Sequence, residues 1–377
     1  MKKLRVIVAG LGAMGSAAAA ELSGRGADVI GLEQFTPAHD MGSSHGESRI
    51  FRMAYFEDSR YVPLLQRALV LWRELEQRAE TEVLHGVGAL LIGPERSEIL
   101  SGALHSAEQW RLPHELLTAA ECRERFPKFK VRDHEIALLE PEAGVLRPER
   151  AILAFQQIAA QSGARLNFNE PVRAWRVDED TVTVQTDVRE YQADRLIITA
   201  GAWAPQLFGE ARKHLSLRRV VQYWFRPQGQ GWVPGAMPAY IWAPGDHETF
   251  YGLPALAGIP GGAKVAYHQV GPEIDDPVRV NRKVGDAEVE QMRRPIIELI
   301  PELNGELVSA KTCIYTNTPD EHFLLGIHPR SERVVVAAGF SGHGFKFASV
   351  IGEILAELAV HGATRHDISL FDPTRFN

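Results

Sequence analysis

The chain is poor in cysteine, which limits both how it is stabilised and what chemistry it can perform. Cys122 and Cys313 are its only two cysteines among 377 residues, and they lie far apart in the sequence. Two cysteines exclude a disulfide scaffold and a cysteine-rich metal site, and they fit a reducing compartment. Stability must therefore come from a large core, for which 45% hydrophobic residues are available, and the length of the chain predicts two domains.

Long apolar runs and an excess of positive charge are also missing. No run of eighteen apolar residues occurs, so we expect no transmembrane helix and no membrane partner. The short apolar run after Met1-Lys2-Lys3 contains Arg5 and ends at glycines, which favours a buried first strand over a signal peptide. The net charge of −7 gives no basis for nucleic-acid binding. We therefore expect a cytoplasmic protein whose partners are small molecules.

The motifs of several enzyme classes are absent as well. The sequence contains no HExxH pair, no nucleophile elbow, no P-loop and no cluster of metal-ligating side chains. Hydrolase and kinase activities therefore have no support, and we expect no metal.

The first 33 residues, in contrast, carry the parts of a dinucleotide-binding unit in the right order. The apolar, β-branched run Leu4–Ala9 predicts a buried parallel strand, and it leads directly into Gly10-Leu11-Gly12-Ala13-Met14-Gly15. Small residues then open a helix, and a second strand, Asp28–Leu32, ends on Glu33. This succession is far more specific than the glycine motif alone.

Each part of this unit has a physical task. Gly10 allows the tight turn, Gly12 lets the backbone approach a pyrophosphate, and Gly15 lets helix and strand pack closely. Glu33, about twenty residues further on, is placed to accept hydrogen bonds from a ribose, and its charge argues against a 2′-phosphorylated cofactor. The unit predicts dinucleotide binding but does not separate FAD from NAD.

Hydrophobic periodicity predicts alternating strands and helices at both ends of the chain, with irregular, β-rich sequence between them. Two apolar strands, Leu196–Trp203 with Gly201 and Val334–Gly339, end in small residues, which leave room for a ligand. The second leads into a helix at Phe345–Ala359. The nucleotide-binding domain is therefore assembled from separated segments, and 218–312 forms much of a second domain. Further helices are expected at 61–76, 106–112, 118–126 and 147–162, and further strands at 83–92, 165–169, 172–177 and 181–186.

Four segments carry residues suited to chemistry, although each also has an ordinary structural explanation. The loop 42–52 is polar and basic without periodicity, which suits ligand contact as well as a solvated loop. Strand alternation places Lys264 and His268 on one face. Cys313 taken alone is more typical of a core filler than of a reactive thiol. Gly342–Phe347 precedes a helix whose N-terminus favours an anion.

Together these segments resemble, over nearly the whole chain, the monomeric sarcosine oxidase and N-methyltryptophan oxidase family of flavoenzymes. The resemblance is carried by Gly10-x-Gly12-x-x-Gly15 with Glu33, Ser44–Arg52, Tyr251-Gly252-x-Pro254, Lys264, His268, Cys313-x-Tyr315-Thr316, Asp320-Glu321-x-Phe323 and Gly339–Phe347. It implies an α/β fold of the α+β two-domain kind, with a Rossmann-type FAD-binding domain and a β-sheet-rich substrate domain, as in glutathione-reductase-like and D-amino-acid-oxidase-like flavoproteins. The expected FAD-binding domain is discontinuous, covering 1–84, 146–215 and 316–377, and the substrate domain covers 85–145 and 216–315.

The resemblance also implies roles for individual residues. In this family FAD is attached covalently through a thioether from a cysteine to the 8α position of the flavin, and Cys313 matches that cysteine. Arg52 and Lys346 match the pair that binds the substrate carboxylate, with Tyr315 and His343 close to the substrate; arginine's fork and lysine's charge suit a carboxylate. The expected cofactor-binding residues are Gly10, Gly12, Gly15, Glu33, Ser43, Ser44, Gly201, Cys313, Gly342, Gly344, Phe345 and Lys346, and the expected catalytic residues are His45, Arg49, Tyr251, Lys264 and His268.

A reaction follows from the resemblance. Lys264 matches the lysine at the flavin edge where oxygen reacts; with an ordinary pKa of about 10.4 it is cationic at neutral pH and stabilises negative charge developing on oxygen. His45 and Arg49 match residues near the flavin, where a cation stabilises the reduced ring. The implied enzyme is a monomer that oxidises a secondary amino acid such as sarcosine to an imine, which hydrolyses to glycine and formaldehyde, while O₂ is reduced to H₂O₂.

Departures from the family pattern leave the substrate open. Glu47-Ser48 stands where Asp-Thr is expected, the segment 253–263 differs in length, and 240–243 is poorly matched. N-methyltryptophan, a cyclic amino acid such as pipecolate, and other N-alkyl amino acids remain alternative substrates. The competing functions are an FAD dehydrogenase subunit that passes electrons to a carrier, a non-catalytic flavin-binding subunit and an NAD dehydrogenase. Lys264 argues against the carrier, and no role is assigned to Cys122.

Overall fold

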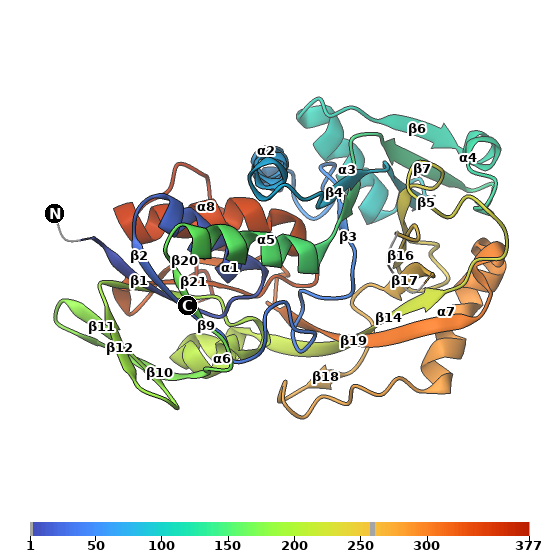
Figure 1. Ribbon diagram of the computed structural model, residues 1–377. Coiled ribbons are helices and arrows are strands. Elements are labelled where there is room, and N and C mark those ends of the chain that lie inside the picture. The colour runs from blue at the N-terminus through green and yellow to red at the C-terminus, as the bar shows by residue number, and fades with distance from the viewer. Residues whose placement is uncertain (1–2, 257–260, 377) are drawn as a thin grey trace.

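One lobe of the molecule is built around a mostly parallel sheet whose strands come from distant parts of the chain (Figure 1). In the computed structural model, which describes residues 3–256 and 261–376, the strand order is β20-β21-β13-β1-β2-β9. All neighbours pair in parallel apart from β20 and β21. The strands are β1 (Arg5–Ala9), β2 (Asp28–Leu32), β9 (Arg165–Asn167), β13 (Arg195–Ile198), β20 (Leu324–His328) and β21 (Ser331–Ala338).

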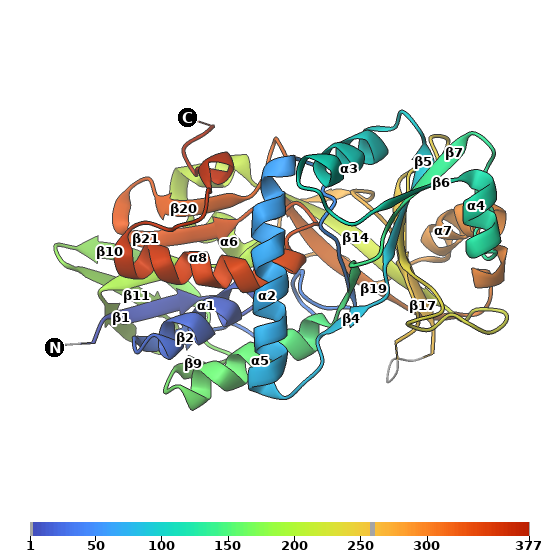
Figure 2. The same ribbon diagram turned by 90° about the horizontal axis from the view of Figure 1, so that it is seen from above.

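Alternation along β1 explains why this sheet is covered on both faces. Val6 and Val8 belong to the apolar cluster that contains the helices, whereas Ile7 and Ala9 belong to the cluster that contains β11. The helices on the first face, seen together in Figure 2, are α1 (Ala13–Gly24), α5 (Pro148–Gln161) and α8 (Ala348–His361). On the other face lies an antiparallel sheet of β10 (Val172–Asp178), β11 (Thr181–Thr186) and β12 (Glu190–Ala193).

The second lobe is built around a larger mixed sheet in the order β18-β14-β17-β16-β15-β5-β7-β6, with β19 also paired to β14. Its apolar face packs against α7 (Asp286–Leu299) and α4 (Ala119–Arg125). The strands are β5 (Ala89–Pro94), β6 (Glu115–Thr118), β7 (Glu135–Glu140), β14 (Ser216–Phe225), β15 (Ala239–Trp242), β16 (Phe250–Leu253), β17 (Ala263–Tyr267), β18 (Glu273–Ile274) and β19 (Leu307–Asn317).

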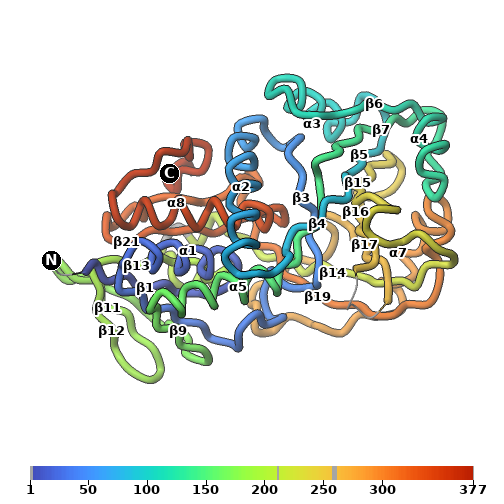
Figure 3. The backbone as a smooth tube through the Cα atoms, turned by 45° about the horizontal axis from the view of Figure 1, so that its top comes forward, coloured from blue at the N-terminus to red at the C-terminus, as the bar shows by residue number. Residues whose placement is uncertain are grey.

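Several segments join the two lobes. The tube in Figure 3 shows the chain leaving the first lobe, entering the second and returning, with the long strands β14 and β19 reaching from one to the other. A small sheet lies where the chain passes between the lobes, and its strands are β3 (Arg49–Phe51), β8 (Gly144–Leu146) and β4 (Leu84–Gly86). Beside it runs α2 (Val62–Ala79), and α3 (Glu98–Gln109) packs on β5. The loop that precedes β3 is thereby held between the lobes.

Three expected elements need correction. The helix expected at 106–112 is α3, which begins at Glu98 because Ser97 caps it by accepting a hydrogen bond from the backbone N–H of Leu100. The strand expected at 83–92 is divided into β4 and β5, since Gly88 adopts a φ of +70°. The strand expected at 196–203 ends at Ile198. In contrast, the capping box at Thr118 is present.

Within the described residues, no helix has both the length and the apolarity needed to span a bilayer.

Candidate active site

The turn between β1 and α1 requires two of its three glycines for steric reasons. Gly10 has a φ of +97°, and a Cβ on it would lie 2.6 Å from the carbonyl oxygen of Thr199. A Cβ on Gly15 would lie 1.8 Å from the carbonyl oxygen of Gly10, so helix and turn touch there. A Cβ on Gly12 would meet only the Ser44 hydroxyl, at 3.9 Å, because Gly12 faces open space. The turn therefore presents bare backbone to a cavity.

Glu33 is buried at the end of β2 and supports this turn. Its carboxylate accepts hydrogen bonds from the backbone N–H of Leu11 at 2.8 Å and of Phe35 at 3.1 Å, and His39 lies 3.4 Å away. The carboxylate also lines the cavity. Its position at the carboxyl end of the second strand is the one predicted for a ribose acceptor.

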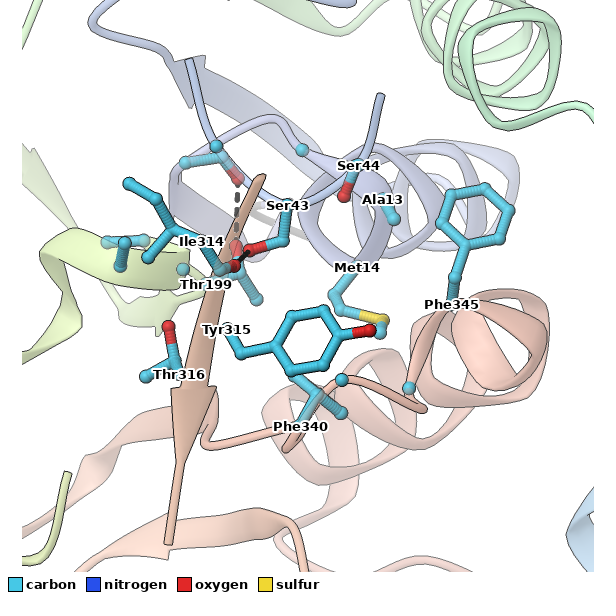
Figure 4. Close-up of a pocket in the computed structure, with 18 of the residues that line it drawn as sticks. Ala13, Met14, Ser43, Ser44, Thr199, Ile314, Tyr315, Thr316, Phe340 and Phe345 are labelled. Carbon is cyan, nitrogen blue, oxygen red and sulfur yellow. Dashed lines mark hydrogen bonds between the residues drawn. The ribbon is translucent and has the colours of Figure 1, made fainter. Parts of the chain in front are cut away.

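A single cavity of about 560 Å³ runs from the glycine turn to the region between the lobes. Figure 4 shows side chains from four parts of the chain around it: Ala13 and Met14 from α1, Ser43 and Ser44 from the loop between β2 and β3, Ile314 to Thr316 from β19, and Phe340 and Phe345 near α8. Most of the predicted site residues line it: Gly10, Gly12, Glu33, Ser43, Ser44, Arg49, Arg52, Gly201, Tyr251, His268, Tyr315, Gly342, His343, Gly344, Phe345 and Lys346.

Four predicted residues do not line the cavity. Gly15 packs behind the turn, and His45, Lys264 and Cys313 lie in the layer behind the cavity wall. The altered segment 253–263 is described only in part, because residues 257–260 lie outside the described residues.

The loop before β3 is held by hydrogen bonds to β19 and by Arg49. The Ser43 hydroxyl donates to the carbonyl of Ile314 at 2.5 Å. Arg49 folds back onto its own loop and donates to the carbonyls of Ser43 and Ser48, each at 2.8 Å. Arg49 therefore presents its positive charge to the cavity from a fixed position.

Lys264, on β17, is fully buried behind this loop. Its ammonium donates to the carbonyl of Gly46 at 3.0 Å and to that of Ser48 at 2.9 Å. Burial, with the charge of Arg49, lowers the pKa of Lys264 well below its usual range, so the expectation of an ordinary pKa is wrong. The two carbonyls oppose this effect, since they accept hydrogen bonds from the charged form.

Unpaired polar atoms remain around this wall. Among the described residues, both ring nitrogens of His45 and the side-chain carbonyl oxygen of Gln222 are buried without a hydrogen-bond partner, and Gln222 lines the cavity. Burial and neighbouring cations lower the pKa of His45 to about 3, so the imidazole is neutral and Arg49 supplies the positive charge here. Buried polar groups are ordinarily paired, and the Gln222 oxygen on the cavity wall can accept a hydrogen bond from a bound group.

At the far end of the cavity lies Arg52, buried to 2% exposure. Its guanidinium donates to both carboxylate oxygens of Glu57, at 2.7 and 3.0 Å, and to the carbonyl of Ala54 at 2.9 Å. The rings of Tyr55 and Phe56 lie 4.3 and 4.2 Å from it. Arg52 holds the pKa of Glu57 at about 2 against the effect of burial. The predicted residue is therefore locked by a partner, Glu57, that sequence reasoning missed.

Lys346 provides a second buried cation at the same place. Its ammonium donates to the carbonyl of His343 at 2.8 Å and lies 5.0 Å from the ring of Tyr55. Burial, with Arg52, lowers the pKa of Lys346 to about 7. His343 shares a 2.5 Å hydrogen bond with the Tyr55 hydroxyl, and burial lowers its pKa to about 3. His268 is likewise held neutral, its pKa lowered to about 4.

Glu140, on β7, fixes the segment that carries Arg52. One of its carboxylate oxygens accepts hydrogen bonds from the backbone N–H groups of Met53 and Ala54, each at 2.6 Å. Burial raises the pKa of Glu140. Sequence reasoning also missed this residue, because it lies more than eighty positions from the backbone it supports and no local pattern marks it.

Cys313 and Tyr315 lie on β19, and Tyr251 lies on β16. Cys313 is buried, its sulfur lies 3.6 Å from the carbonyl oxygen of Ser43, and it clusters with Tyr315. Tyr315 projects into the cavity (Figure 4), and its ring packs directly on Gly342. A Cβ on Gly342 would lie 2.1 Å from the ring, so only glycine leaves room for it. Burial raises the pKa of both Tyr251 and Tyr315. The thiol of Cys313 lies one residue before Ile314–Thr316, the part of β19 that lines the cavity.

The sequence profile described as FAD dependent oxidoreductase matches residues 5–358. The chain belongs to the FAD-dependent oxidoreductase family. It is 48% identical to a monomeric sarcosine oxidase of Streptomyces avermitilis, over 98% of this chain and 97% of that protein. It is also 36% identical to an N-methyl-L-tryptophan oxidase of Escherichia coli O127:H6, over 99% and 100%. The predicted family resemblance and the predicted FAD cofactor are thereby confirmed.

Solved structures with similar folds confirm the predicted fold. NikD, an amino acid oxidase of nikkomycin biosynthesis, in its open form, superposes with a TM-score of 0.85 at 25% identity, covering 98% of each chain. Glycine oxidase from Geobacillus kaustophilus superposes with a TM-score of 0.82 at 22% identity, covering 99% of each chain.

The residues of this family member fit FAD. The glycine turn leaves backbone room at Gly12, where a Cβ would project into the open cavity, and Glu33 stands at the end of β2. The unpaired side-chain oxygen of Gln222 lines the same cavity, and the unpaired ring nitrogens of His45 are buried behind its wall. The N-terminus of α1 faces that cavity with Gly12 as its cap, as dinucleotide phosphates require.

Proposed function

We propose that this flavoprotein demethylates a secondary amino acid such as sarcosine, with O₂ as the electron acceptor. One observation carries the proposal: the cavity that begins at the glycine turn ends at two buried cations, Arg52 and Lys346, which both lie over the ring of Tyr55. The names of the relatives support the reaction class. For sarcosine the balanced reaction is sarcosine plus O₂ plus H₂O giving glycine, formaldehyde and H₂O₂.

Bound FAD would supply the redox step by accepting two electrons from the substrate's C–H bond next to nitrogen and delivering them to O₂. The protein supplies position and charge. Arg52 and Lys346 bind the carboxylate, one through its fork and the other as a point charge. The pair with Glu57 and the stacking rings pre-orient the guanidinium, so little rotamer freedom is lost on binding.

The amine end of the substrate must be uncharged before it is oxidised. His268 and His343, which line the cavity, are neutral at physiological pH because burial lowers the pKa of each. A desolvated wall of aromatic rings, including Tyr251, disfavours an ammonium and favours the neutral amine. The same wall excludes water until the imine leaves.

We also propose that Lys264 activates oxygen and that Arg49 stabilises the reduced flavin. Backbone carbonyls of one loop hold both side chains and accept hydrogen bonds from the charged form of Lys264, so positive charge is positioned where negative charge develops. This preorganisation is what electrostatic catalysis requires, and it also argues for O₂ over a protein carrier as acceptor.

We propose that the flavin is attached through Cys313. The thiol would add to the 8-methyl carbon with loss of two hydrogens, and the two electrons would pass through the flavin to O₂. The buried position of Cys313, one residue before the cavity wall of β19, supports this. Acid precipitation should leave a yellow pellet, whereas Cys313→Ser should release its flavin and Cys122→Ser should not. A colourless wild-type pellet would refute the linkage.

We propose, finally, that the domains are those expected from the sequence. The mostly parallel sheet draws its strands from 1–84, 146–215 and 316–377, and the larger sheet draws most of its residues from 85–145 and 216–315.

The substrate class is tested by adding sarcosine, N-methyltryptophan or pipecolate to the oxygen-free protein. A substrate should bleach the flavin absorbance, and the bleached flavin should recover its colour when air is admitted. If no N-alkyl or cyclic amino acid bleaches the flavin, the proposed substrate class is wrong. If bleaching occurs but air restores the colour far more slowly than turnover with an artificial electron carrier, the proposed acceptor is wrong.

A further inference from the structure

We propose that Glu149, in the first turn of α5, positions the ammonium of Lys264 through the loop Gly46–Ser48 that lies between them. Glu149 is thus a positioning residue for the oxygen step, and this inference rests on the proposed role of Lys264. No local sequence pattern connects the two, since they come from different lobes.

On one side, the loop Gly46–Ser48 contacts the carboxylate of Glu149. Glu149 accepts hydrogen bonds from the backbone N–H of Gly46 at 2.7 Å and from that of Glu47 at 3.0 and 3.1 Å. Both loop residues have left-handed backbones, with φ of +91° for Gly46 and +67° for Glu47. Consecutive N–H groups in such a turn converge on one anion, and here the anion is the side chain of Glu149.

The other side of the same loop faces Lys264. The carbonyls of Gly46 and Ser48 accept its two hydrogen bonds, at 3.0 and 2.9 Å. A non-glycine residue with positive φ is strained, so Glu47 keeps this conformation only while its N–H is held. Loss of the Glu149 carboxylate would therefore relax the loop and turn both carbonyls away from the ammonium.

The loop also cannot shift sideways. A Cβ on Gly46 would lie 2.1 Å from the side-chain oxygen of Gln222, so the backbone is pressed against β14. Glu149 accepts a hydrogen bond from the N–H of the peptide group between Gly46 and Glu47, and Lys264 donates one to the carbonyl of that same peptide group. Hydrogen bonds in such a chain polarise one another and strengthen the whole.

The charges around Lys264 make this positioning necessary. Burial and Arg49 disfavour its ammonium form, whereas the carboxylates of Glu149 and Glu47 favour it. Burial raises the pKa of Glu47, whose neighbours include Lys311 and Glu149 itself. The ring of Trp224, on the neighbouring strand β14, lies 5.4 Å from the ammonium and adds a weaker attraction. Glu149 is thus the carboxylate that both orients the loop and favours the charge.

The test uses the FAD-loaded protein and the variant Glu149→Gln, which keeps the size of the side chain and removes its charge. The rate of reoxidation by O₂, followed by stopped flow, should fall about tenfold at pH 8, and its decline with rising pH should begin about one unit lower, while flavin reduction by substrate is unchanged. Glu98→Gln removes the same charge from the first turn of α3 and should leave both rates at the wild-type values.

A second readout does not depend on turnover. Sulfite adds to oxidised flavin to give an anionic adduct, so its dissociation constant reports positive charge near the ring. Sulfite should bind more weakly to Glu149→Gln and to Lys264→Met, and normally to Glu98→Gln. Glu149→Asp keeps the charge with a shorter reach, so it should retain the wild-type pH at which reoxidation declines; this variant serves if the glutamine protein fails to fold.

The double variant Glu149→Gln with Lys264→Met decides between the alternatives. If Glu149 acts through Lys264, reoxidation of the double variant matches that of Lys264→Met alone. If the double variant is slower than Lys264→Met by the factor that Glu149→Gln alone causes, Glu149 acts independently of Lys264. A wild-type rate of reoxidation in Glu149→Gln would also overturn the inference. If Lys264→Met itself reoxidises normally, the oxygen role of Lys264 fails first, and the inference falls with it.

Discussion

Replacement of Arg52 by alanine should both weaken carboxylate binding and destabilise the protein. Arg52 and Glu57 are buried, with side chains 2% and 12% exposed, and they share two hydrogen bonds. Removing one partner of such a pair leaves an unpaired buried charge, at a cost of about 3–5 kcal/mol. The pKa of Glu57 gives an independent figure: the difference between an ordinary 4.5 and about 2 corresponds to about 3 kcal/mol at neutral pH.

The same linkage fixes how the effect depends on pH. Because the folded-state pKa of Glu57 is lowered, its contribution to stability is present above the unfolded value of 4.5 and is lost as the pH falls towards 2. The difference in stability between the wild type and Arg52→Ala should therefore be largest near pH 7 and shrink below pH 4.5. Urea unfolding of both proteins measures this difference in stability, provided that the free energy of unfolding depends on urea concentration with the same slope in both.

Arg60→Ala provides a matched control. Arg60 also makes two hydrogen bonds to one carboxylate, that of Asp58, but its side chain is 55% exposed. An exposed pair contributes about 0–1 kcal/mol, so this variant should be nearly as stable as the wild type. Acetate binding, followed by the flavin spectrum, should weaken roughly 10- to 150-fold in Arg52→Ala alone. Equal destabilisation by both variants, with unchanged acetate affinity, would refute the reasoning.

Three further variants test other parts of the account. Lys346, with a pKa of about 7, binds a carboxylate only when protonated, so acetate affinity should fall towards tenfold per pH unit above pH 7, and Lys346→Met should flatten this slope in an acetate titration at several pH values. Lys264→Met should slow flavin reoxidation far more than flavin reduction; equal slowing of both in stopped-flow traces would contradict its role. Gly15→Ala forces a Cβ to 1.8 Å from the carbonyl of Gly10 and should abolish FAD binding, measured as flavin absorbance per protein, whereas Gly24→Ala on the same helix meets only Arg78, at 3.8 Å, and should keep its flavin.

Local patterns were sufficient to predict the elements that build the nucleotide-binding lobe. The first β-α-β unit and the helix α5 are encoded by periodicity, caps and glycine spacing within a few residues of each element, and the capping box at Thr118 marks α4 of the other lobe in the same way. The helix α7 was not foreseen, because its apolar face lies in a segment rich in glycine and proline and Pro295 lies inside it. Tertiary packing against the second sheet overrides that local signal.

The site residues also fall into two groups, those that the sequence predicted and those that only the fold reveals. The residues proposed to bind the substrate carboxylate, Arg52 and Lys346, were predicted through the family resemblance. The carboxylates that hold them, Glu57, Glu140 and Glu149, were not, because each acts on groups that only the fold brings near, and a lone glutamate carries no signal in a sequence. The lowered pKa of Lys264 was missed for the same reason, since burial is a property of the folded molecule.

The central claim is tested most directly by incubating the purified flavoprotein with sarcosine in air and measuring formaldehyde, H₂O₂ and consumed O₂ together. All three should change in equal amounts, with glycine as the remaining product. Formaldehyde without H₂O₂, or no formaldehyde from sarcosine or any other N-methyl amino acid, would contradict the central claim.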